Sequence, residues 1–81
     1  MFLHVTNAKY LKDYTLEIAF NNGKKGLIDL KPTLWGKMFS PLQDKKLFKK
    51  HRIDPQLVTI VWDNGADLAP EYLLSLIKPN D

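Results

Sequence analysis

An α+β domain, with helices covering one face of an antiparallel sheet, is predicted from three features of the sequence. Apolar and polar side chains alternate through residues 15–20, which is the pattern of a half-buried strand. The Asn22-Gly23 pair that follows has the turn chemistry of a tight hairpin. Further on, a β-rich apolar run turns at residues 63–65 and leads into a helix start at Pro70. The predicted order is three strands, helix, two strands, helix.

The first thirty residues predict a three-stranded antiparallel meander. Residues 2–8 alternate and form the first expected strand, and residues 9–14 separate it from the second. Residues 15–20 are the clearest strand in the chain, and residues 25–30 return after the turn. We expect the three strands to be neighbours in one sheet.

The third strand is predicted to end at Pro32, because proline cannot donate to a strand ladder. Residues 34–39 are mostly apolar and aromatic but include a glycine, so we expect a short helical turn followed by loop. Trp35, Met38 and Phe39 could form an exposed patch for a partner, although burial in the core is the commoner fate of such side chains.

A single amphipathic helix is expected over residues 42–50. Ser40 would be its N-cap and Pro41 its first helical residue. In this helix Leu47 and Phe48 would point inward and the lysines outward.

A second hairpin is expected from residues 51–54 and 57–62, with its turn at Pro55-Gln56. The later strand is apolar on both sides, which predicts a central place in a five-stranded sheet. The open edges of such a sheet invite pairing with another chain, either a copy of itself or a different partner.

The last helix is predicted to begin at Pro70 after Asp67 or Ala69, with Glu71 in its first turn, where the helix dipole favours an anion. Residues 78–81 would form a frayed tail. The expected inner face of this helix consists of Leu73, Leu74 and Ile77.

The composition indicates one small domain, residues 1–81, with little surface to spare for a large enclosed pocket. The chain has no cysteine, no apolar run of the ~20 residues that cross a bilayer and no signal-peptide pattern, so we expect a cytoplasmic protein that does not enter a membrane. The net charge of +3 is too small to indicate nucleic acid binding unless the cations are clustered.

The turn at residues 63–67 has a structural and a metal-binding interpretation. Asp63, Asn64 and Asp67 could offer oxygen ligands to a hard cation, but the segment lacks the register of an EF-hand loop. We favour a turn in which Asp and Asn accept backbone hydrogen bonds, Gly65 takes a positive φ and a carboxylate caps the next helix.

No catalytic, metal or cofactor motif occurs in the sequence, so we expect no enzyme activity, no catalytic residue, no metal and no cofactor. One hypothesis of this class remains, a small enzyme that uses His4 or His51 with Asp63 or Asp67. It requires those side chains to converge in one cleft.

Cations cluster in only one segment, residues 45–52, and suggest a nucleic-acid-binding face. Helical spacing would place four lysines on one side, where phosphate contacts would make binding steeply salt-dependent. A solvated helix face has the same appearance, and we favour it because lysine dominates and no base-reading motif is present. The candidate residues are Lys45, Lys46, Lys49, Lys50 and Arg52.

Residues 62–71 resemble the bacterial family catalogued as domain of unknown function 2442, with the pattern W-x-N-G-A-D-L-x-P-E. The same family pattern fits residues 20–23, 29–30 and 39–44, so the resemblance covers nearly the whole chain. It implies an α+β fold without an established activity, in a family where some members are fused to a helix-turn-helix domain or encoded in toxin–antitoxin-like pairs. We expect no such DNA-binding domain in a chain of this length. The motif residues are Trp62, Asn64, Gly65, Asp67, Pro70 and Glu71.

Together these observations favour a non-enzymatic interaction or regulatory module, one member of a toxin–antitoxin-like pair. It would bind a protein partner, or a copy of itself, through a sheet edge or the surface from Trp35 to Phe39. The motif at residues 62–71 would then be scaffold. The alternative is a nucleic-acid-binding protein that uses residues 45–52.

Overall fold

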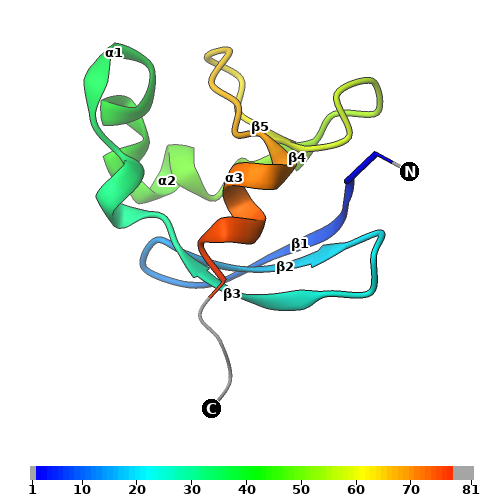
Figure 1. The fold of residues 1–81 in the computed structure, drawn as a ribbon. Coiled ribbons are helices and arrows are strands. Elements are labelled where there is room, and N and C mark those ends of the chain that lie inside the picture. The colour runs from blue at the N-terminus through cyan, green and yellow to red at the C-terminus, as the bar shows by residue number, and fades with distance from the viewer. Residues whose placement is uncertain (1, 78–81) are drawn as a thin grey trace.

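The computed structural model describes residues 2–77, whose elements form two layers (Figure 1). A three-stranded sheet is one layer, and the helices and a second hairpin lie over one of its faces. The α+β class predicted from the sequence is confirmed, while the predicted tail at 78–81 lies outside the described residues. The strands are β1 (Val5–Lys12), β2 (Thr15–Phe20), β3 (Lys25–Asp29), β4 (Arg52–Ile53) and β5 (Ile60–Val61). The helical segments are η1 (Lys31–Thr33), α1 (Gly36–Phe39), η2 (Ser40–Gln43), α2 (Lys45–Phe48) and α3 (Pro70–Ser75).

The first sheet is the predicted antiparallel meander, in which β2 lies between β1 and β3. Leu16, Ile18 and Phe20 of β2 are buried, as their alternation with polar residues predicts. The turn into β3 has Gly23 at a φ of 85°, which confirms the hairpin predicted from the Asn-Gly pair.

The first strand differs from the prediction. It was expected over residues 2–8, but β1 covers residues 5–12 and so includes most of the segment 9–14 that we interpreted as a connection. Only two residues remain for the turn into β2. The strand continues because Tyr10 faces the core, where its ring packs edge-to-face on Phe48 with centroids 6.2 Å apart.

The single helix predicted over residues 42–50 is wrong, since the 3-10 turn η2 and the separate helix α2 take its place. The break is at Asp44, whose backbone is extended and whose Oδ1 accepts a hydrogen bond from Lys46 N at 3.0 Å. Ser40 is not the cap; its Oγ donates to Gly36 O at 2.8 Å. The side chain of Asp44 therefore caps the start of a new helix, α2, at a position predicted to lie inside one longer helix.

Only one of the two side chains predicted to point inward from this segment does so. Phe48 is fully buried, and its ring lies against those of Tyr14 and Trp62 at centroid distances of 5.3 and 5.9 Å. Leu47 remains 41% exposed. Consecutive side chains on a helix diverge by about 100°, so a helix of one turn cannot turn both into the same core.

The predicted second hairpin is present, but it is short and separate from the first sheet. Among the strands within residues 2–77, β4 and β5 pair with each other and with no strand of the first sheet, so the predicted five-stranded sheet with a central last strand is wrong. The residues between them form a tight turn, in which Asp54 Oδ1 accepts hydrogen bonds from Leu57 N and Gln56 N that lower the pKa of this carboxyl. Val58 takes a left-handed φ of 49°, and its carbonyl accepts a 2.9 Å bond from Val5 N at the start of β1. This turn uses the residues that longer strands would need.

α3 begins at Pro70 with Glu71 in its first turn, as predicted. The residue before it, Ala69, is extended, and no side chain caps the helix, so a capping role for Asp67 is wrong. Asp67 instead forms an isolated antiparallel bridge with Val61.

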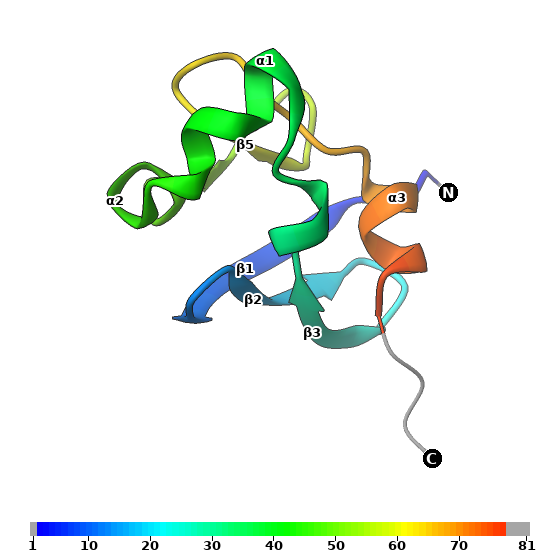
Figure 2. The same ribbon diagram turned by 90° about the vertical axis from the view of Figure 1, so that its left-hand side faces the viewer.

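α3 closes the core over the first sheet (Figure 2). Leu73 is fully buried, and Leu74 and Ile77 pack against the core from the edge. A Cβ at Gly26 of β3 would fall 2.5 Å from Ile77 Cγ2, so the lack of a side chain there allows α3 to approach the strand. The core cluster consists of Val5, Leu16, Ile18, Phe20, Ile28, Leu30, Leu34, Leu42, Phe48, Ile60, Trp62, Ala66, Leu68 and Leu73.

Candidate functional site

An apolar groove of about 400 Å³ lies between the segment that follows η1 and the start of α3. The large apolar side chain most exposed in this groove is Trp35, which is 74% accessible to solvent. The groove is lined by Thr33, Trp35, Phe39, Asp67, Leu68, Ala69 and Tyr72.

Local backbone geometry holds Trp35 at this position. Leu34 is buried beside it, and Gln43 Nε2 donates to Leu34 O at 2.7 Å, which anchors the segment. Trp35 itself is extended, and its N donates to Thr33 O at 2.9 Å. Gly36 then reverses the chain at a φ of 83°, a conformation that L side chains rarely adopt. The indole is therefore presented by a fixed backbone.

A side-chain hydrogen bond joins the two walls of the groove. Thr33 Oγ1 and Tyr72 OH are 2.9 Å apart, although they are far apart in the sequence. Phe39 continues the groove into the core, because its ring packs edge-to-face on Trp62 with centroids 6.4 Å apart. The groove is thus continuous with the packed interior.

The three residues predicted for a partner surface do not all lie together. Trp35 and Phe39 line the groove, but Met38 is not among its lining residues. Met38 is exposed beside the turn at Gly65, and its carbonyl accepts a 2.8 Å bond from Asn64 Nδ2.

The sequence did not point to Tyr72 as a site residue. Tyr72 is adjacent to Leu73 on α3 but lies outside the inner face predicted for that helix. An aromatic residue on the outer face of a helix is the signal that could have identified it. Its meeting with Thr33 depends on how α3 docks, which no local pattern encodes.

One side of the groove is acidic. Asp67 lines it and Glu71 follows on the first turn of α3, and both are exposed. Neither carboxylate forms an ion pair with any other residue in the range 2–77. The groove therefore combines aromatic lining residues with Asp67, and Glu71 is nearby on α3; no ion pair within residues 2–77 offsets either charge.

The motif at residues 62–71 is scaffold for the groove and the core. Trp62 is buried, and its Nε1 donates to Phe48 O at 3.0 Å. Asn64 Oδ1 accepts a bond from Ala66 N at 3.0 Å, and Gly65 has a φ of 90°. The turn predicted from the sequence is confirmed at Asn64 and Gly65, but Asp63 was also expected to accept a backbone hydrogen bond and instead pairs with Arg52.

Replacing Gly65 by valine is expected to lower the free energy of unfolding by about 1–3 kcal/mol, since a β-branched residue is strained at this φ. A Cβ there would also lie 3.4 Å from Met38 Cε. Urea unfolding followed by circular dichroism measures the change. Asn64→Gly serves as a neighbouring control for the side-chain bonds, and an unchanged midpoint for Gly65→Val would contradict the assignment.

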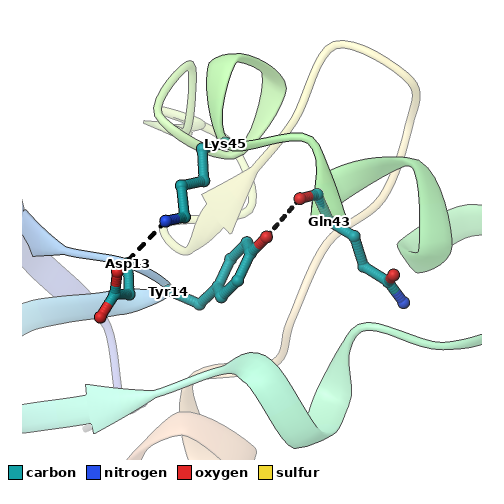
Figure 3. A network of polar contacts seen from close by, with 4 residues as sticks. All are labelled: Asp13, Tyr14, Gln43 and Lys45. Atoms are coloured by element: carbon teal, nitrogen blue, oxygen red, sulfur yellow. Dashed lines mark hydrogen bonds and ion pairs between the residues drawn. The ribbon is translucent and has the colours of Figure 1, made fainter.

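The basic residues do not form a free stripe. Lys45 Nζ lies 3.2 Å from Asp13 Oδ1, and this bond raises the pKa of Lys45 (Figure 3). Arg52 pairs with Asp63, and Lys49 Nζ lies over the Tyr10 ring, 5.0 Å from its centroid. Of the five candidates, only Lys46 and Lys50 are exposed without such a contact to another residue in the range 2–77.

Figure 3 shows Lys45 pointing toward Asp13 in the turn between β1 and β2. The Tyr14 hydroxyl donates to Gln43 O and ties the β1–β2 turn to η2, next to the Lys45–Asp13 pair. The lysine Nζ also lies 5.8 Å from the Tyr14 ring centroid. This side of α2 is therefore engaged within the fold.

The histidines stand in different settings. His4 is partly buried and its backbone N donates to Asn21 Oδ1 at 2.9 Å, while His51 Nδ1 is buried without a hydrogen-bond partner in the range 2–77. The carboxylate of Asp63 is held by Arg52. Within the described part of the chain, no group of three or more His, Cys, Asp or Glu side chains could hold a metal ion.

Comparison with known proteins gives one match. A family model described as "Protein of unknown function (DUF2442)" covers residues 5–79. No curated protein and no solved structure matches the chain. Among residues 2–77, no helix is both long and apolar enough to span a membrane.

Proposed function

This chain belongs to the family of proteins of unknown function DUF2442, and we propose that it is a non-enzymatic protein-interaction module whose binding surface is the groove beside Trp35. The observation that supports this function is the exposure of an indole on a fixed backbone, over an apolar groove that continues into the core. Folded proteins seldom leave a large aromatic surface exposed unless it is used for binding. Tryptophan and tyrosine are also the side chains that most often dominate binding energy.

The chemistry of the groove favours a particular partner. An apolar side chain would fill the space between Trp35 and Tyr72, and a neighbouring Lys or Arg would neutralise Asp67 and Glu71. We therefore propose a partner protein with a basic residue next to an apolar anchor. In this proposal the chain is the cytoplasmic regulatory member of a toxin–antitoxin-like pair.

Replacing Trp35 by serine is expected to weaken partner binding at least about 30-fold without altering the fold, because a central aromatic anchor contributes 2 kcal/mol or more. Tagged protein would capture its partner from native lysate with and without nuclease. Calorimetry with the purified partner would then give the affinity of each variant.

Leu57→Ser is the matched control, because Leu57 is a similarly exposed apolar residue on another turn and does not line the groove. It should bind like the natural sequence. If Trp35→Ser retains full affinity while the fold is intact, the groove is not the binding surface.

Nucleic acid binding is the alternative, and the exposure of Lys46 and Lys50 favours it. In that case the captured material would be nuclease-sensitive, and binding would weaken steeply with salt. The double change Lys46→Glu and Lys50→Glu would abolish it, whereas Trp35→Ser would not.

A further inference from the structure

The outer edge of β3 carries backbone groups that no other strand within residues 2–77 uses. At the two ends of the β2–β3 ladder, Leu30 N donates to Tyr14 O and Phe20 N donates to Lys24 O, each at 2.9 Å. Bonded pairs alternate along an antiparallel ladder, so the even-numbered residues of β3 bond to β2. The N–H and C=O groups of Lys25, Leu27 and Asp29 consequently point away from the sheet. None of them makes a backbone hydrogen bond on that side within residues 2–77.

The opposite edge of the same sheet is much less suitable for pairing. β1 has two register shifts against β2, and its first residue, Val5, already donates to Val58 O. Such irregularities protect an edge from further pairing. β3 pairs with β2 in continuous register from Lys25 to Asp29, so it is the straight and open edge.

The sequence of β3 is complementary to itself when read in the antiparallel direction. Lys25 and Asp29 lie at equal distances on either side of Leu27. Two copies related by a two-fold axis at Leu27 would therefore place each lysine opposite an aspartate of the other copy. The two Leu27 side chains, each 53% exposed, would meet at the centre.

We propose that two copies of this chain pair antiparallel through β3 and form one continuous six-stranded sheet. Backbone and side chains select the same register, because Lys25, Leu27 and Asp29 are also the residues with outward backbone groups. The pairing would form about six backbone hydrogen bonds, two for each of the three residue pairs. All three side chains lie on the face opposite buried Ile28, away from the core.

Other registers lose this agreement. A shift by one residue places the free backbone groups of one copy opposite residues of the other copy whose N–H and C=O groups already bond to β2. A shift by two residues places Lys25 or Asp29 opposite Leu27 of the other copy, so the intermolecular Lys25–Asp29 pairs are lost and Lys25 keeps its 3.9 Å contact with Glu17 of its own chain. Only the register centred on Leu27 satisfies both conditions.

Sedimentation equilibrium over a range of concentrations tests this pairing. The natural chain should exceed its 9.4 kDa monomer mass as concentration rises. Lys25→Asp sets two carboxylates opposite each other and should weaken dimerisation at least tenfold, and adding Asp29→Lys to the same chain should restore it by exchanging the charges. Lys24→Asp, one residue outside the strand, is the control and should dimerise normally.

A second variant tests pairing at the β3 edge without disturbing the fold of the monomer. Leu27→Pro removes an outward N–H but no bond to β2, so it should give a folded monomer by circular dichroism. The pairing is wrong if the natural chain stays monomeric at every concentration, or if it dimerises and both Lys25→Asp and Leu27→Pro leave the dimer unchanged. The groove is a separate surface, and binding that depends on Trp35 should persist in the Leu27→Pro monomer.

Discussion

Replacing Phe48 by alanine is expected to remove about 3–5 kcal/mol from the free energy of unfolding. The side chain is fully buried, and the rings of Tyr10, Tyr14 and Trp62 surround it. Truncation leaves a cavity lined by large aromatic side chains, which cannot collapse without breaking their own contacts. Small domains have total stabilities of about 5–10 kcal/mol, so this one change should remove about a third or more of the stability and lower the urea midpoint accordingly.

Leu47→Ala provides the control for Phe48→Ala, since it removes a side chain from the same short helix at an exposed position. Its effect should be within about 0.5 kcal/mol. Equal destabilisation by the two changes would show that the loss comes from the helix and not from the core.

Replacing Trp62 by phenylalanine is expected to cost about 2–4 kcal/mol. Part of this cost is the smaller ring, and part is Phe48 O, which loses the 3.0 Å hydrogen bond from the indole Nε1 and remains buried. Unfolding in urea measures the sum. The bond joins two residues that also pack together, so the effect should not add to that of Phe48→Ala.

Trp35→Phe is the matched control for Trp62→Phe, because it makes the same chemical change at an exposed site. Its stability should remain within about 0.5 kcal/mol of the natural chain. It also leaves Trp62 as the single indole, so fluorescence can report unfolding of the core directly. A cost below about 1 kcal/mol for Trp62→Phe would contradict its role.

Elements set by local chemistry could be predicted from the sequence. β2 follows from the alternation through residues 15–20, the first hairpin from its Asn-Gly turn, and the start of α3 from Pro70. Each of these signals acts between residues a few positions apart, so it is visible in the sequence. The buried Trp62 and the turn at Gly65 belong to the same group.

Elements decided by competition or by distant contacts were predicted less well. Asp44 can act as a cap or as an ordinary helix residue, and the sequence does not show which interaction is stronger. The apolar run through β5 indicates burial but not its place in the fold, and here β5 belongs to a separate hairpin whose Ile60 packs in the core with residues of the first sheet. Part of the groove could be predicted, because Trp35 and Phe39 are close together in the sequence. Tyr72 could not, because its place in the groove depends on how α3 packs against the rest of the fold.

The division into a meander and a covering layer has a consequence for how the chain folds. β1, β2 and β3 are consecutive and joined by turns of a few residues, so bringing them together costs little loop entropy. The covering half is tied to them by distant contacts, such as Val5 to Val58 and Tyr14 to Gln43. The meander can therefore form first, and on the ribosome it also emerges first. We therefore expect docking of the second half to limit the folding rate, so that a more stable Asn22-Gly23 turn accelerates only the earlier step.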